Sequence, residues 1–241
     1  DAGVFGRDDL WQFVRFAYEQ NVISAGKRVA RLIDGADLDA IDRVAERGKE
    51  WLAQAEAKSL DLKSPARAQV AVLAVLRVAR TDTALAGRHF ERFAEQLSKA
   101  DQAYVWSRLG GIAARRLDPD ALSWFARADA AQPDAALDDD NLAWRTRAAL
   151  RAGEWTQVRK SIERMSAEAQ GDSTWTYWRA RALRTEGLRE PAEALLGSIA
   201  AEPSFYGKLA SEDLGWMQPL PQRAVPPGAE ELARMRANPG L

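Results

Sequence analysis

The chain has 241 residues and carries 34 Lys+Arg against 35 Asp+Glu, which leaves a formal net charge of −1. This balance provides no overall positive field that would attract nucleic acid or an anionic membrane surface. The sequence has no cysteine and a single histidine, His89, which excludes disulfides, thiolate metal sites, a cysteine nucleophile and every multi-histidine metal site. We therefore predict no metal site and no cofactor, and we interpret His89 as a solvated or locally bonded helix residue.

Alanine and arginine dominate the composition, with 46 and 27 residues respectively. Both residue types favour helix, so the sequence predicts an all-α protein. The longest apolar run, Val70–Leu76, has seven residues, whereas a membrane-spanning helix needs about 20. No basic and then apolar leader precedes Asp1, which fits either a protein that is not exported or one whose signal peptide has been removed.

Apolar residues recur at helical spacing through the first half of the chain and predict amphipathic helices. Pro65 behind the capping residue Ser64 predicts a helix start, and the helix that follows is apolar on most sides, as in a helix buried between neighbours. Asp82 restarts the pattern and Asp118-Pro119 ends it. The predicted core-facing residues are Leu10, Phe13, Val14 and Ala17; Ile41, Val44, Trp51 and Leu52; Leu85, Phe90, Phe93 and Leu97; and Tyr104, Leu109 and Ile112.

From Asp118 onward the predicted helices shorten to roughly 12 to 16 residues, with turns of about two to five, as in stacked helical hairpins. No stretch has the period-two alternation of a strand. We expect residues 1–215 to form one superhelical domain. Four prolines after Gly215 predict a linker over Trp216–Gly228. A short helix over Ala229–Ala237 then leads toward a further C-terminal domain, so that residues 216–241 form the connection.

An internal repeat of 34 residues lies in the second half of the chain. The helix after it keeps the same register, since apolar residues recur at matching positions in both copies. A helical-hairpin repeat of this length is typical of an α-solenoid, and we expect about a dozen helices in antiparallel pairs. The repeat is TPR-like only in part, because Lys160 stands where a tetratricopeptide repeat has a small residue. The identical pairs are Trp144/Trp178, Arg145/Arg179, Arg147/Arg181, Ala148/Ala182 and Gly153/Gly187, and the apolar pairs are Val158/Ala192, Ile162/Leu196 and Met165/Ile199.

These residues resemble the α-superhelical domain of the soluble lytic murein transglycosylases of Gram-negative bacteria. The resemblance covers about a third of the chain, and its most distinctive piece is Phe205-Tyr206-Gly207 after the Trp178 helix. The first half, Asp1 to Leu117, fits the same architecture without a specific motif. The segments that carry the resemblance are Ala143–Gly153 with Trp155, Ile162 and Met165; Trp175–Leu183; and Ser204–Ala210 with Leu214-Gly215.

The resemblance implies a periplasmic enzyme in which the superhelix positions a C-terminal lysozyme-like domain. In that domain a glutamic acid followed directly by Ser protonates the glycosidic oxygen, and muramic acid closes into a 1,6-anhydro ring. Glu-Ser occurs nowhere in this sequence. We therefore predict no catalytic residue in this chain, expect it to be inactive alone, and interpret it as a fragment of a longer enzyme.

The repeated arginines Arg145, Arg147, Arg179 and Arg181 are the candidate binding residues. Peptidoglycan carries carboxylates on its lactyl groups and stem peptides, and guanidinium groups bind carboxylates through paired hydrogen bonds. The alternative, which we favour, is that these arginines form ion pairs within and between repeats.

Two further patterns resemble ligand sites and have simpler interpretations. Asp138-Asp139-Asp140-Asn141 precedes a predicted helix, where acidic residues cap free N–H groups, and no calcium-type loop surrounds it. Gly110-Gly111 lies within a helical pattern without a following Lys-Ser/Thr, so we predict close helix packing rather than a phosphate loop. We interpret the nine tryptophans as mostly core residues.

The sequence thus predicts a scaffold for a lytic transglycosylase that guides peptidoglycan glycan strands, with those strands and its own catalytic domain as partners. The alternative is a TPR-like module that binds a partner peptide or helix. A third hypothesis, an independent glycosidase, requires an acid in the concave face that no motif identifies.

Overall fold

The computed structural model describes residues 5–57, 62, 64–133, 135, 137–216 and 226–237. Within these ranges there are 14 α-helices, one short 3-10 helix and no strand, which confirms the all-α prediction. The helices are α1 (Arg7–Glu19), α2 (Ile23–Ala30), α3 (Leu38–Ala57), α4 (Pro65–Ala79), α5 (Thr83–Phe93), η1 (Ala94–Gln96), α6 (Lys99–Arg115), α7 (Ala121–Ala131), α8 (Asp139–Ala152), α9 (Trp155–Glu163), α10 (Ala167–Gln170), α11 (Ser173–Thr185), α12 (Arg189–Ile199), α13 (Phe205–Asp213) and α14 (Ala229–Arg236).

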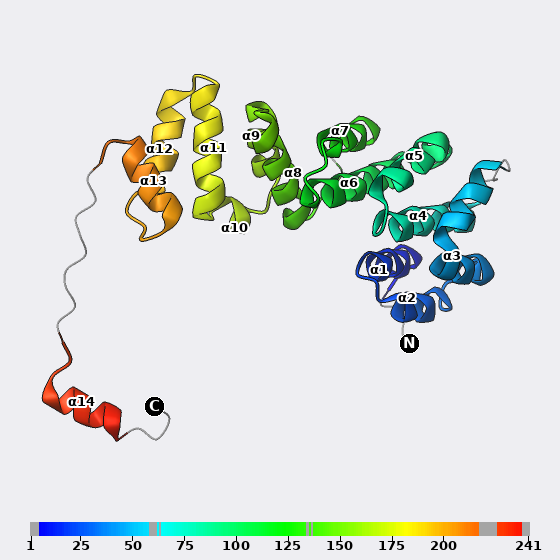
Figure 1. Cartoon of the computed structure of the whole chain (residues 1–241), viewed down its shortest axis with the longest axis horizontal. Coiled ribbons are helices and arrows are strands. Elements are labelled where there is room, and N and C mark those ends of the chain that lie inside the picture. The colour runs from blue at the N-terminus through cyan, green and yellow to red at the C-terminus, as the bar shows by residue number, and fades with distance from the viewer. Residues whose placement is uncertain are drawn as a thin grey trace.

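Helices α1 to α13 form an elongated stack in which each helix packs against its neighbours in sequence (Figure 1). The hairpin pairs are α1–α2, α3–α4, α6–α7, α8–α9 and α11–α12. Each hairpin forms one layer of the stack, and one of its helices also contacts the next layer. Contacts between α1 and α4, between α4 and α6, and between α6 and α8 thus form a continuous row. This arrangement is the predicted superhelical solenoid.

Helix boundaries fall where the sequence places caps. Asp82 caps α5 by accepting a hydrogen bond of 2.9 Å from the Leu85 backbone N–H. Helix α4 starts at Pro65 as predicted, but the side chain of Ser64 before it makes no capping hydrogen bond. Helix α6 ends at Arg115, and Leu117 then takes a left-handed conformation with φ 59° before Asp118-Pro119. The left-handed Leu117 turns the chain back on the helix end, where the Asp118 N–H donates to the carbonyl oxygen of Ala113 at 2.9 Å.

The buried side chains form three successive clusters instead of one central core. The first extends from α1 to α8 and includes Tyr18, Phe90 and Phe125, all fully buried. The second joins α8, α9 and α11, and the third joins α11, α12 and α13. Each layer is therefore stabilised mainly by the layers before and after it.

Most residues predicted to face the core are buried or partly buried, but Phe13 is not. Its side chain is 45% exposed, and Phe16 on the same helix is 55% exposed. Helix α1 is the first layer of the described stack and packs on α2 and α4, so its remaining side has no layer beyond it in the described residues. Periodicity identified the helix but could not identify this end position.

The 34-residue repeat corresponds to the hairpins α8–α9 and α11–α12. Ala148 and Ala182 are both buried, and the apolar positions of α9 match buried positions of α12. Gly153 and Gly187, which follow α8 and α11, both have left-handed backbones, with φ 73° and 85°. The turn between the two helices of each repeat thus contains a conformation that only glycine adopts without strain. The short helix α10 separates the two copies.

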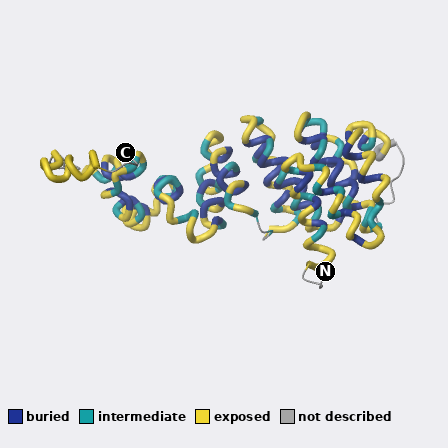
Figure 2. Tube along the Cα trace, turned by 90° about the horizontal axis from the view of Figure 1, so that it is seen from below, coloured by how far each residue is buried: buried dark blue, intermediate teal, exposed yellow. Residues whose placement is uncertain are grey.

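Beyond the third cluster, Trp216 is 56% exposed and is the exception to the expected burial of the tryptophans. Residues 217–225 of the predicted linker lie outside the described residues. The predicted last helix is present as α14, which contains no buried residue (Figure 2). None of the helices that the structure describes is long and apolar enough to cross a bilayer.

Close helix packing explains Gly110-Gly111, as predicted. A Cβ atom on Gly110 would lie 3.0 Å from the Phe125 ring, and one on Gly111 would lie 2.3 Å from Oδ1 of Asn141. Gly207 of α13 is equally close to its neighbours but meets backbone, because its Cβ would lie 2.3 Å from the carbonyl oxygen of Glu202 and 2.8 Å from that of Ile199. Backbone carbonyls cannot rotate away as side chains can.

Gly207→Ala should lower the free energy of unfolding by about 1–3 kcal/mol, because the added methyl group forces backbone to move. Urea denaturation followed by circular dichroism measures the change. Gly228→Ala is the matched control, since no atom lies within 4 Å of that Cβ position and α14 buries nothing. Equal denaturation midpoints for wild type and Gly207→Ala would contradict the packing argument.

Candidate functional site

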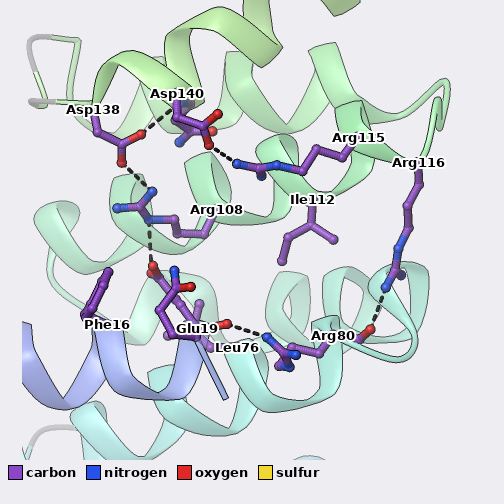
Figure 3. Close-up of a pocket in the computed structure, with 12 residues that line it drawn as sticks. Phe16, Glu19, Leu76, Arg80, Arg108, Ile112, Arg115, Arg116, Asp138 and Asp140 are labelled. Carbon is purple, nitrogen blue, oxygen red and sulfur yellow. Dashed lines mark hydrogen bonds and ion pairs between the residues drawn. The ribbon is translucent and has the colours of Figure 1, made fainter. Parts of the chain in front are cut away.

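A cavity of about 790 Å³ lies along the row formed by α1, α4, α6 and α8. Figure 3 shows how its side chains converge from these four helices and their ends. Four arginines and three carboxylates form most of the polar wall. The lining residues are Phe16, Glu19, Gln20, Leu76, Arg80, Arg108, Ile112, Arg115, Arg116, Asp138, Asp140 and Asn141.

Arg108 is the central polar residue of this cavity. Its Nε lies 3.0 Å from Oε1 of Glu19, and its Nη1 donates a hydrogen bond of 2.6 Å to Oδ2 of Asp138. The Nε contact is electrostatic, because this N–H makes no aligned hydrogen bond in the described structure. Arg108 therefore links the end of α1, the middle of α6 and the N-terminus of α8 (Figure 3).

The other arginines of the cavity also have partners within the chain. Arg115 pairs with Asp140, and Arg116 donates to the hydroxyl of Thr83 and, at 2.5 Å, to the carbonyl oxygen of Arg80. Arg80 itself donates to the carbonyl oxygen of Glu19 at 2.5 Å. These contacts hold the helices in register, so the guanidinium groups are engaged before any ligand arrives.

The cavity also has an apolar part. Three apolar side chains line it: Phe16, which is exposed, the buried Leu76, and Ile112. Asn141 donates a hydrogen bond of 3.2 Å to the carbonyl oxygen of Ser107, while its own buried Oδ1 has no hydrogen-bond partner among the described atoms. The arrangement suits a ligand that has both polar and apolar faces.

Glu19 is the most unusual titratable group of the cavity. Burial raises the pKa of its carboxyl above the ordinary value, and the charge of Arg108 and a hydrogen bond from the Tyr104 hydroxyl oppose this only in part. Burial likewise raises the pKa of Tyr104, followed by the effect of the Glu19 charge. No sequence motif identified Glu19, because its partners are distant in the sequence. Tyr104, for example, is 85 residues away.

Arg145, one of the four arginines predicted from the repeat, has its side chain only 5% exposed. Its two terminal nitrogens donate to the two carboxylate oxygens of Asp129 at 3.0 and 2.5 Å, and one of them also donates to Gln157 at 3.1 Å. Arg164 shares the same carboxylate at 3.0 Å. The favoured alternative, ion pairing within the chain, describes Arg145.

The other three predicted arginines differ from Arg145 and from one another. Arg179 lies 3.4 Å from Glu163, and Arg181 contacts the Tyr177 hydroxyl at 3.0 Å and Asp213 at 3.5 Å. Arg147 has no carboxylate partner in the described chain and lies over two indole rings, 4.8 Å from the centre of Trp144 and 5.1 Å from that of Trp175. The structure does not bring the four arginines to one site.

The acidic segment before α8 caps that helix, as predicted, and also does more. Asp138 accepts from the Asn141 backbone N–H at 2.8 Å, while Asp139 accepts from the backbone N–H and the hydroxyl of Ser166. Burial alone would raise the pKa of Asp138, but the hydrogen bond from Asn141 and the Arg108 charge lower it below its ordinary value.

His89 lies half-buried in α5. Across the described residues, no group of three or more potential ligands could hold a metal ion.

Solved structures of other proteins share this fold. No protein-family model and no curated protein matches the chain. The solved structure of an inactive mutant of the lytic transglycosylase Slt from Pseudomonas aeruginosa is similar over 98% of this chain, with a TM-score of 0.67 and 25% sequence identity. The predicted resemblance to the α-superhelical part of soluble lytic transglycosylases is thereby confirmed.

Two further solved structures show the same fold. The 70-kDa soluble lytic transglycosylase from Escherichia coli is similar over 98% of this chain, with a TM-score of 0.56 and 21% identity. A complex of the 70-kDa soluble lytic transglycosylase with bulgecin A gives a TM-score of 0.56 at 20% identity, again over 98% of this chain. The chain spans only 38–39% of the length of these three proteins.

Arg108→Met should raise the pKa of Glu19 further, because the variant loses the charge that most opposes burial. Carboxyl chemical shifts in an NMR pH titration measure this. A folded-state pKa above the ordinary 4.5 means that Glu19 favours folding most below pH 4.5, and that this contribution is lost as pH rises through the folded-state pKa. Arg127→Met, which alters an exposed pair with Glu91, is the control. An unchanged Glu19 titration in Arg108→Met would contradict the assignment.

Asp129→Asn should destabilise the fold by about 1–3 kcal/mol, because it leaves the buried Arg145 without a carboxylate. Burial would raise the pKa of Asp129, but hydrogen bonds from Arg145 and Arg164 and their charges lower it below 3.8. Its contribution is therefore present above pH 3.8 and is lost as pH falls through the folded-state pKa. Thermal unfolding from pH 7 to pH 2 should show a smaller acid loss for Asp129→Asn than for wild type; parallel curves would argue against it.

Proposed function

We propose that this chain is the superhelical scaffold of a lytic transglycosylase that cleaves peptidoglycan in the periplasm. The observation that carries the proposal is the similarity to the Pseudomonas aeruginosa enzyme along 98% of this chain but only 38% of that one. On this reading the scaffold positions a catalytic domain and holds glycan strands near it. A solenoid suits this task because it offers an extended surface on which many weak contacts hold a polymer.

Polar contacts between layers support a positioning role. Arg108 joins three helices of the row, Arg116 joins α6 to the turn after α4, and Asp139 joins α8 to the turn before α10. The contacts of Arg108 and Arg116 join helices of different hairpins, so they fix how one hairpin lies on the next. A fixed curvature is what a scaffold needs in order to hold another domain at a constant place.

Among the described residues, Glu19 is the structural candidate for proton donation, since it is a partly buried carboxyl with a raised pKa in the cavity beside Arg108. General acid catalysis needs a proton that can reach the leaving oxygen. Glu19 instead contacts Arg108 and accepts from Tyr104. We assign Glu19 a structural role and propose that this chain alone has no catalytic activity.

Incubation with purified sacculi tests both parts of this proposal. The chain should pellet with intact sacculi, and it should release no 1,6-anhydro-muropeptides that mass spectrometry can detect. Bovine serum albumin serves as the control for non-specific pelleting. Release of anhydro products that Glu19→Gln abolishes would overturn the scaffold role in favour of an independent enzyme. Failure to pellet, together with tight binding to a defined peptide, would favour the peptide-binding alternative.

A further inference from the structure

A row of alternating arginines and aromatic rings crosses from α6 through α8 to α11. The Arg115 guanidinium lies 5.6 Å from the centre of the Trp144 ring, and Arg147 lies 4.8 Å from the same ring. Arg147 also lies 5.1 Å from the centre of Trp175, whose helix α11 carries Trp178 one turn later. The row thus begins at the cavity described above and ends in a different groove.

This second groove lies between α8, α11 and α13 and has a volume of about 430 Å³. Trp178 and Tyr206, both partly exposed, provide its aromatic surface, while Trp175 lines it as a buried ring of the second cluster. Arg147 and Arg151 provide charge. None of the described residues that line it is a carboxylate. In the larger cavity, by contrast, four arginines face three carboxylates. The groove therefore carries an uncompensated positive charge.

Aromatic rings hold the Arg147 side chain in place, and no carboxylate among the described residues pairs with its charge. Arg147 is exposed, it stacks against two indoles, and within the described chain it forms no ion pair or hydrogen bond. Arg151, four residues later, lies on the same face of α8 and is also exposed and without an ion pair among the described residues. Stacking on Trp144 and Trp175 orders the Arg147 guanidinium while leaving its N–H edge free. Arg151 adds a second exposed guanidinium beside it, so the two side chains together can bind one carboxylate.

The residues around Arg147 favour an anion on one of its two sides, the side of the groove. On its other side Arg147 borders a hollow that contains Asp139, Glu168 and Asp172. An anion placed there would meet three acidic residues, whereas an anion in the groove beside Arg151 meets none. Trp175 borders both hollows, but Trp178 and Tyr206 line only the groove, with Trp178 Nε1 3.4 Å from the Tyr206 hydroxyl.

From this geometry we propose that the groove of Arg147, Arg151, Trp175, Trp178 and Tyr206 binds a carboxylate-bearing saccharide, with the carboxylate on the two arginines and a sugar ring on the aromatic surface. A sugar ring has C–H faces and hydroxyl edges, which match the apolar faces and polar tips of tryptophan and tyrosine. The inference rests on the proposed function, because peptidoglycan strands carry such carboxylates on muramic acid and its peptide.

Isothermal titration calorimetry with two probes tests the groove in the 241-residue chain. The first is the disaccharide N-acetylglucosaminyl-N-acetylmuramic acid with a free lactyl carboxylate, and the second is uncharged chitotetraose. Wild type should bind the first more tightly. The double variant Arg147→Gln/Arg151→Gln should weaken its binding about 10- to 100-fold, the effect expected for losing charge-assisted hydrogen bonds, and should leave chitotetraose binding unchanged.

Arg189→Gln is the matched control, because Arg189 is also exposed and unpaired among the described residues but lies outside the groove. Circular dichroism verifies that each variant is folded, as expected for exposed side chains. If wild type does not bind the disaccharide, or if both double and control variants bind it as wild type does, the groove assignment is wrong. Pelleting of wild type with sacculi in that case would leave the proposed function standing, whereas failure to pellet would remove it separately.

Discussion

Close contact between α6 and its neighbours is the constraint on which the longest part of this superhelix depends. Helix α6 packs against α4, α5, α7 and α8, more elements than the helices at either end of the stack contact. Gly110 and Gly111 allow this, because a Cβ at either position would meet Phe125 or Asn141. The same approach brings Arg108 and Arg115 of α6 beside the acidic start of α8. Packing of small residues and pairing of charges are thus two results of a single helix position.

Local features of the sequence predicted most of this architecture. Caps and breaks such as Asp82 and Asp118-Pro119 act within a few residues, so they can be recognised without knowing the fold. The two repeat glycines were recognisable for the same reason. Phe13 was predicted wrongly because its exposure depends on which layers surround α1, and no local pattern contains that information.

The candidate site was much harder to predict than the fold. Glu19 and Arg108 belong to different layers, and 27 arginines give every carboxylate many possible partners. The repeat drew attention to four arginines, but equal sequence positions do not have equal surroundings. Arg145 meets Asp129 beneath it, whereas Arg147, two residues later on the same helix, points to the opposite side and meets only rings. Which arginine is available depends on the neighbouring layer.

The matching left-handed glycines after α8 and α11 have a consequence for how such proteins change in length. Each closes its hairpin with the same backbone turn, and each hairpin buries its apolar face mainly against adjacent hairpins. Duplication or deletion of one whole unit would therefore join surfaces of the same kind. Evolution could lengthen or shorten the superhelix by one hairpin at a time while every remaining hairpin keeps its shape.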